Sequence, residues 1–166
     1  MDGLSKKEIE VISDLEFSKK YYFTRDDIKH HFKKRDQINH TIHKLISKKR
    51  IISLNRNKYY LIPIKAKTGK WIDDPFIQAD EMFDGNNYFI GGWAAANYWG
   101  FTDQIPMKIE LYTTKRQGHC KILSNEFIFK RTTKNRIERS VTEKIGEHQF
   151  NIESKEESKK WMDGRT

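Results

Sequence analysis

The first 62 residues carry helix and hairpin signals in an order that few folds accommodate. Ser5 and Glu8 form a capping-box pattern, in which the serine accepts from an early backbone amide and the glutamate reaches back, so a helix is expected near residues 5–16. The stretch from Thr24 to Asp27 repeats this pattern and predicts a second, short helix, with an aromatic strand-like stretch before it at residues 21–23. Apolar residues follow both helix starts at helical spacing: Ile9, Ile12 and Leu15, then Ile28 and Phe32.

A third helix is expected from about Arg35 to Lys48. Four apolar residues recur there at the spacing of a core-facing stripe: Ile38, Ile42, Leu45 and Ile46. Two short apolar stretches come next, at residues 51–54 and 58–62, and the turn between them is Asn-Arg-Asn. Asparagine tolerates the positive φ of tight turns, so the two stretches are expected to pair as a β-hairpin. Three short helices and a hairpin predict a winged helix-turn-helix domain over residues 1–62.

The positive charge of the chain is concentrated in the same segment. The formal net charge is +9, and residues 19–58 contain 13 Lys and Arg against 3 Asp and Glu. Such an asymmetry is typical of a polyanion-binding half joined to a nearly neutral half. A basic surface that is solvated and has no partner would give the same counts, and this alternative stays open from charge alone.

Double-stranded DNA suits this segment better than RNA, because the sequence contains neither an RNP motif nor an OB-fold pattern. In a winged helix the third helix enters the major groove, while the hairpin lies along the backbone or in the minor groove. The amides of Gln37 and Asn39 have the donor and acceptor that adenine requires, and a lysine such as Lys44 can reach guanine or phosphate. The candidate DNA-binding residues are Arg35, Gln37, Asn39, His40, His43, Lys44, Lys48, Lys49, Arg50, Arg56 and Lys58.

The second half of the chain predicts a separate domain. Helical periodicity is lost over residues 63–73, which are expected to form an interdomain linker. Residues 74–166 are expected to fold as a small α+β domain with a mixed or antiparallel sheet, so that the whole chain is α+β. The expected helices are 74–83, 93–99 and 154–162, and the expected strands are 88–90, 108–113, 121–123, 126–130 and 149–152.

Patterns for catalysis and metal binding are weak. His119 and Cys120 are adjacent, and neighbours in a strand point to opposite faces, which argues against a nucleophile and its base. The pairs His30–His31 and His40/His43 suggest zinc, but no cysteine or cluster of acidic ligands joins either pair. Gly91–Gly92 lacks a phosphate-loop pattern and is expected to serve a tight turn. We therefore expect no enzyme activity, no cofactor and no metal site.

The sequence also bears on the compartment. No apolar run approaches the roughly 20 residues that cross a bilayer, and the first residues lack the apolar stretch of a secretion signal. The single cysteine, Cys120, excludes an internal disulfide framework. These features predict a cytoplasmic protein without a membrane partner.

Residues 88–106 resemble a segment of the AbiEi-type antitoxins, the transcriptional-regulator components of bacterial type IV toxin–antitoxin systems. The segment reads Tyr-Phe-Ile-Gly-Gly-Trp-Ala-Ala-Ala-Asn-Tyr-Trp-Gly-Phe-Thr-Asp-Gln-Ile-Pro. The Thr-Lys-Arg step at residues 114–116 and the strand-like residues 126–129 match the next part of that family's sequence, and the likeness covers roughly residues 5–157. The motif residues are Gly91, Gly92, Trp93, Asn97, Trp99, Gly100, Gln104, Pro106, Lys115 and Arg116.

This resemblance implies a division of labour between the two halves. The winged helix would bind inverted repeats in the promoter of its own operon and repress it. The second domain would counteract a nucleotidyltransferase-like toxin, by direct contact or indirectly. In the family, a segment like residues 153–157 leads into further helices, so a chain of 166 residues is expected to be a short or truncated member. The DNA contacts that carry over fall on Gln37, His40, Lys44 and Arg56, with their basic neighbours.

Two other functions remain open from the sequence. Winged helices also serve as protein-interaction modules, and in that case the domain would not bind DNA sequence-specifically. A small enzyme that acts on nucleic acid is the third hypothesis. The sequence contains neither a nucleotidyltransferase signature nor a triad of metal-binding carboxylates, which disfavours it.

Overall fold

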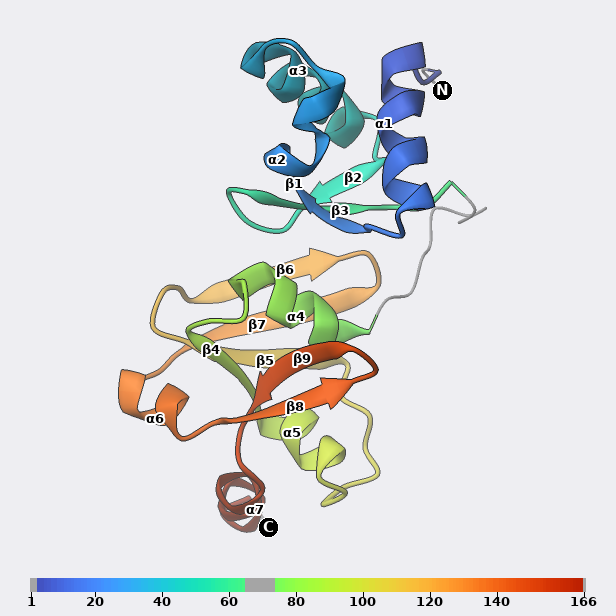
Figure 1. Ribbon diagram of the computed structural model, residues 1–166. Coiled ribbons are helices and arrows are strands. Elements are labelled where there is room, and N and C mark those ends of the chain that lie inside the picture. Colours follow the sequence, from blue (N-terminus) through green and yellow to red (C-terminus); the bar gives the residue numbers. More distant parts are fainter. Residues whose placement is uncertain (1–2, 65–73, 166) are drawn as a thin grey trace. The chain divides into compact units, whose positions relative to one another are not determined.

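The computed structural model describes residues 3–64 and 74–165, and the chain divides into two units, residues 1–71 and 72–166 (Figure 1). Each unit contains helices and its own sheet, so the fold is mixed α+β, as the sequence predicts. Most of the linker expected at residues 63–73 lies outside the described residues.

The first unit contains three helical segments and a three-stranded antiparallel sheet of order β1-β3-β2. The strand β1 precedes the second helix, and β2 and β3 form the hairpin around the turn at residues 54–57. The elements are α1 (Lys6–Phe17), β1 (Tyr22–Thr24), α2 (Arg25–Ile28), the 3₁₀ turn η1 (Lys29–His31), α3 (Arg35–Ser47), β2 (Ile51–Ser53) and β3 (Lys58–Leu61).

Local sequence explains where the first two helices begin. At the start of α1, the Ser5 amide donates to the Glu8 carboxylate at 2.5 Å, and the Glu8 amide donates to the Ser5 hydroxyl at 3.3 Å. At the start of α2, the Thr24 amide donates to Asp27 Oδ2 at 2.7 Å. Both predicted capping boxes are therefore confirmed, and each satisfies amides that no helical carbonyl reaches.

The core of the first unit lies between the helices and the sheet. Ile38, Ile42 and Leu45 are buried in it, as the stripe on α3 predicts. Two other predicted core residues face solvent instead: Ile46 is 40% exposed and Ile9 is 46% exposed. The prediction was wrong for these two because each helix presents a narrow face to the core. In α1 that face is taken by Val11, Ile12 and Leu15.

The second unit is built on a six-stranded mixed sheet of order β6-β7-β5-β4-β9-β8. The pairs β5–β7 and β4–β9 are parallel, and the other neighbours are antiparallel. Its elements are α4 (Pro75–Phe83), β4 (Tyr88–Gly91), α5 (Gly92–Tyr98), β5 (Lys108–Thr113), β6 (Gly118–Ile122), β7 (Asn125–Arg131), α6 (Lys134–Glu138), β8 (Val141–Ile145), β9 (His148–Ile152) and α7 (Lys155–Asp163).

The buried strand β4 lies inside this sheet and organises the unit. All four of its residues are buried, and β5 and β9 pair with its two edges. Asp74 caps α4 by accepting from the Phe76 amide at 2.8 Å, with Pro75 in the first turn as expected. Two elements, α6 and β8, were not expected from the sequence, and both carry mostly polar residues.

Within the described residues, no helix combines the length and the apolar character that crossing a bilayer requires.

Candidate nucleic-acid interface

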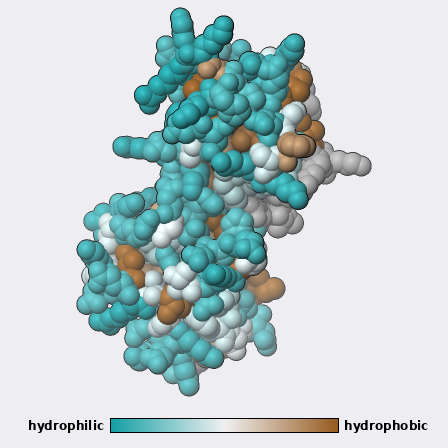
Figure 2. All heavy atoms as spheres, viewed as in Figure 1, coloured by the Kyte–Doolittle hydropathy of each residue, from teal (hydrophilic) through white to brown (hydrophobic). Residues whose placement is uncertain are grey.

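The outward side of α3 carries the polar residues that the sequence places there. Because Ile38, Ile42 and Leu45 pack into the core, the opposite side of the helix is left to solvent. On the face of the first unit that Figure 2 displays, hydrophilic residues predominate. The exposed candidates on α3 are Arg35, Gln37, Asn39, His40, His43 and Lys44.

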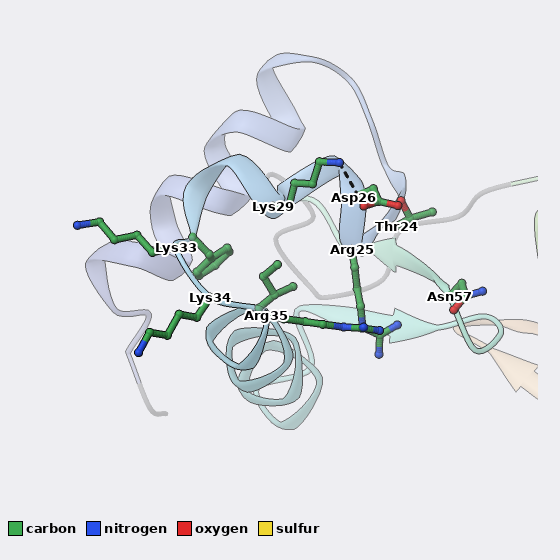
Figure 3. Close-up of a pocket in the computed structure, with 10 residues that line it drawn as sticks. Thr24, Arg25, Asp26, Lys29, Lys33, Lys34, Arg35 and Asn57 are labelled. Carbon is green, nitrogen blue, oxygen red and sulfur yellow. Dashed lines mark hydrogen bonds and ion pairs between the residues drawn. The ribbon is translucent and has the colours of Figure 1, made fainter.

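A groove of about 810 Å³ lies where α2, η1, the start of α3 and the β2–β3 turn meet (Figure 3). Five of its lining residues are cations and one is an acid, and we call it the basic groove. In Figure 3 the side chains of Lys33 and Lys34 extend away from the ribbon. Lys29 lies 3.4 Å from Asp26 in a solvent-exposed pair, which is worth little in stability. The lining residues are Thr24, Arg25, Asp26, Lys29, Phe32, Lys33, Lys34, Arg35, Ile38 and Asn57.

Arg25 ties the hairpin turn to α3 at the edge of the basic groove. Its Nε donates to Asn39 Oδ1 at 3.0 Å, and an Nη donates to the carbonyl of Arg56 at 3.0 Å. Its guanidinium also lies 5.2 Å from the centroid of the Tyr59 ring. These contacts fix the turn beside α3. Arg25 was not among the residues expected from the sequence, because its partners are 14 and 31 residues away in the chain.

The side-chain carbonyls of Gln37 and Asn39 are already engaged. Gln37 Oε1 accepts from the amides of Lys33 and Lys34 at 3.2 and 3.3 Å, which caps the start of α3. Asn39 Oδ1 accepts from Arg25 at 3.0 Å. Of the paired donor and acceptor that the sequence predicts for adenine, the acceptor oxygen of each amide is therefore already used within the unit. His40, His43 and Lys44 are left as the exposed polar residues at the centre of the helix.

Two predicted DNA contacts are directed into the fold instead. Lys48 Nζ lies 2.8 and 3.0 Å from the two carboxylate oxygens of Glu8 and 2.9 Å from the carbonyl of Gly3. An Nη of Arg50 donates to the carbonyl of Ile62 at 3.1 Å. The sequence places both cations at the end of the third helix, but their charged groups are bonded to partners within the unit, so we remove them from the candidate set.

The bond from Lys48 matters because the Glu8 side chain is only 2% exposed. Burial alone raises the pKa of Glu8, but the hydrogen bonds from Lys48 and from Ser5 lower it by more, so the net pKa is below its ordinary value. The carboxylate therefore stays charged in the folded chain and holds the start of α1 to the end of α3.

The remaining candidates lie at the end of α3 and on the hairpin. Lys49 is exposed, with a positive φ of 55°, directly after the helix. Arg56 is exposed on the β2–β3 turn, and Lys58 is half-buried at the start of β3. A second hollow, of about 560 Å³, lies between α1 and α3, and its lining includes His40 and Lys44.

In the second unit, most of the motif residues singled out in the sequence over residues 88–106 support the fold. Gly92 begins α5 at φ +60°, and a Cβ there would overlap the carboxylate of Glu110. Trp99 Nε1 donates to the carbonyl of Glu153 at 2.9 Å, and Asn97 Nδ2 donates to the carbonyl of Thr102 at 3.0 Å. A Cβ at Gly91 would meet the Tyr112 ring, Gly100 has φ +73° after α5, and Pro106 is half-buried.

Four other motif residues lie nearer the surface of the second unit. The indole of Trp93 meets that of Trp161 edge-on, with 5.3 Å between ring centroids. The guanidinium of Arg116 lies 3.6 Å from the centroid of the Phe129 ring, in a cation–π contact. Gln104 and Lys115 are exposed.

Glu153 and Cys120 are among the titratable groups of the second unit whose pKa is raised. Glu153 is 5% exposed and accepts from an Nη of Arg136 at 2.8 Å. Burial raises the pKa of this carboxyl, and the nearby Arg136 offsets only part of the shift. Burial also raises the pKa of the Cys120 thiol, which lies 4.0 Å from the sulfur of Met82. A raised thiol pKa disfavours the thiolate that a cysteine nucleophile needs.

Comparison with known proteins gives a likeness of fold. No protein-family model matches the chain, and no curated protein matches it. The fold is similar to the crystal structure of the RV2827C protein from Mycobacterium tuberculosis, with a TM-score of 0.54 and 17% sequence identity. The similarity covers 79% of this chain and 47% of that one, so this chain spans about half the length of its neighbour. At this identity the likeness shows a shared fold alone.

Proposed function

We propose that the chain is a DNA-binding transcriptional regulator whose first unit acts as a winged helix-turn-helix. One observation carries the proposal: the exposed polar face of α3 adjoins the basic groove, and Arg25 holds the hairpin turn beside that helix. A helix for the major groove and cations for the flanking phosphates are what such a module requires.

In this proposal α3 enters the major groove with His40, His43 and Lys44 towards the base edges. The cations of the basic groove other than Arg25 neutralise phosphates, and Arg56 on the β2–β3 turn reaches the backbone or the minor groove beside the helix. Lys48 and Arg50 contribute only indirectly, through the stability of the unit.

The biological role that we propose rests on the resemblance of residues 88–106 to the AbiEi-type antitoxins. The chain would repress its own operon by binding promoter inverted repeats, and the second unit would counteract a nucleotidyltransferase-like toxin without itself being an enzyme. In the second unit, motif residues such as Trp99 and Asn97 hydrogen-bond within the fold, which suits a scaffold whose outer surface counteracts the toxin.

DNA binding is tested by footprinting and fluorescence anisotropy on the region upstream of the reading frame. The full chain should protect an inverted repeat and prefer it to a scrambled duplex. The triple variant His40→Ala/His43→Ala/Lys44→Ala should lose most of this preference, because it removes the three exposed central side chains of α3. The control is Lys155→Ala/Lys159→Ala/Lys160→Ala on α7, which removes more positive charge from the second unit and should still keep the preference of the wild type for the inverted repeat.

The protein-interaction module is the alternative outcome of this test. If the triple variant keeps full sequence preference, the assignment of α3 as the recognition helix is wrong. If the chain binds no duplex yet retains a neighbouring gene product after nuclease treatment, the first unit is a docking module. The antitoxin role is tested separately, by growth rescue when the chain is co-expressed with a nucleotidyltransferase-like toxin encoded beside it.

A further inference from the structure

The fold brings together three side chains that are separated in the sequence. Asp14 lies on α1, and His30 and His31 form the end of the 3₁₀ turn η1. His30 Nε2 lies 2.9 Å from Asp14 Oδ2, and His31 Nε2 lies 3.0 Å from the same oxygen. The sequence shows no cluster of acidic ligands joined to this histidine pair, and Asp14 supplies a carboxylate from 16 residues upstream. We infer that Asp14, His30 and His31 form a binding site for a divalent transition-metal ion of the zinc type.

The separations suit such an ion. Zinc binds imidazole nitrogen and carboxylate oxygen at about 2.0–2.2 Å, so two ligands at bond angles of 90–110° lie roughly 2.9–3.5 Å apart. Both nitrogen–oxygen distances already fall in this range. The three ligand atoms all lie within 4.8 Å of one another, so a small rotation of one ring completes the set. His30 has the freedom to make it, because its side chain is 59% exposed.

The surroundings leave room for the remaining coordination positions. Asp14 is 44% exposed and His31 is 16% exposed, so the cluster is anchored on one side and open to water on the other. The two imidazole rings lie with their centroids 4.1 Å apart, and both turn Nε2 towards α1. Zinc, cobalt and nickel ions accept a ligand set of two imidazoles, one carboxylate and water. Calcium and magnesium ions prefer oxygen ligands alone.

Metal binding would fasten α1 to the segment that leads into α3. Without metal, the two histidines hold Asp14 through exposed or half-buried hydrogen bonds. With metal, those bonds are replaced by coordination bonds, which hold only when the unit is folded, so the ion stabilises the folded state. Metal binding at this cluster does not depend on DNA binding.

The test uses the full chain after treatment with a chelator. Co²⁺ titration followed by visible absorption, and Zn²⁺ titration by calorimetry, should each give one equivalent per chain. Excess Zn²⁺ should raise the unfolding temperature of the wild type by more than about 5 °C. The single variants Asp14→Asn, His30→Gln and His31→Gln should each weaken binding at least tenfold, and these side chains are not core residues.

The double variant His40→Gln/His43→Gln is the matched control, since that pair on α3 has no third ligand among the described residues. It should bind Co²⁺ and Zn²⁺ as the wild type does. Three results would each overturn the inference: no saturable binding by the wild type, unchanged binding in all three single variants, or equal loss in the control. Circular dichroism of each variant separates lost coordination from lost folding.

Discussion

The basic groove makes a quantitative prediction about the salt dependence of DNA binding. The perturbation is the triple variant Lys33→Ala/Lys34→Ala/Arg35→Ala, which removes three consecutive exposed cations from the groove wall. Their loss leaves the start of α3 in place, because Gln37 accepts from the backbone amides of Lys33 and Lys34 and alanine keeps those amides. The variant therefore changes charge and little else.

The magnitude follows from the cations that are available to phosphate. Arg25 is engaged within the unit, so the groove offers four: Lys29, Lys33, Lys34 and Arg35. Each neutralised phosphate adds about −0.9 to the slope of log affinity against log salt, so the slope of the variant should be shallower by about 2.7. Between about 50 and 200 mM salt, the groove contribution falls about 150-fold in the wild type and only about 3- to 4-fold in the variant.

The assay is anisotropy titration of a labelled promoter duplex at four or more salt concentrations. The variant Lys155→Ala/Lys159→Ala/Lys160→Ala removes the same charge from α7 in the second unit and should leave the slope near that of the wild type. Identical slopes for the groove variant and the wild type would refute the assignment of the groove to phosphate binding. So would an equal reduction in the α7 variant, because net charge alone would then explain the effect.

Three further predictions concern stability. Lys48→Ala leaves the buried Glu8 carboxylate without its cation and should lower the free energy of unfolding by about 3 kcal/mol in urea titrations. The salt slope of DNA binding should not change. A loss of stability under about 0.5 kcal/mol would contradict the pairing. Burial raises the pKa of Glu8, but the bonds from Lys48 and Ser5 lower it by more, so the net pKa in the folded chain is below the ordinary value of 4.5. The carboxylate therefore stabilises the fold at pH values above 4.5, and this contribution is lost as the pH falls through the lower folded pKa. Urea titrations from neutral to acidic pH should thus show a weaker pH dependence for Glu8→Gln than for the wild type, and parallel curves would exclude this role. Gly92→Ala combines a positive φ with an overlap at the Glu110 carboxylate and should cost about 1–3 kcal/mol in thermal unfolding, whereas Gly3→Ala, which meets nothing within 4 Å, should cost almost nothing.

The features that the sequence predicted correctly depend on neighbours a few residues apart. Ser5 and Glu8, and Thr24 and Asp27, are three positions apart, and both capping boxes form. The same holds for the buried face of α3 and for the strand over residues 108–113, whose apolar periodicity is local. The edge strand β8 was missed because none of its residues is buried, and its less exposed side carries the charged Glu143 between Val141 and Ile145, which weakens the apolar alternation.

The parts of the candidate site that the sequence did not predict depend on contacts between residues that are far apart in the chain. The role of Arg25 depends on its bond to a carbonyl 31 positions away, and that of Lys48 on a carboxylate 40 positions away. Nothing in the spacing of a basic run separates a lysine that faces solvent from one that neutralises a buried acid. Likewise, Asp14 joins His30 and His31 only once α1 packs against η1.

The parallel pairing of β4 with β9 has a consequence for the order in which the protein matures during synthesis. Ile90 pairs with Ile152, and the Glu153 amide donates to the Ile90 carbonyl at 2.8 Å, so the middle of the second sheet cannot close until about 60 further amino acids have been added. The described elements of the first unit, by contrast, end at Leu61. Domains fold as units while translation proceeds, so the amino-terminal half can reach its final form on the ribosome while its neighbour is still an open chain.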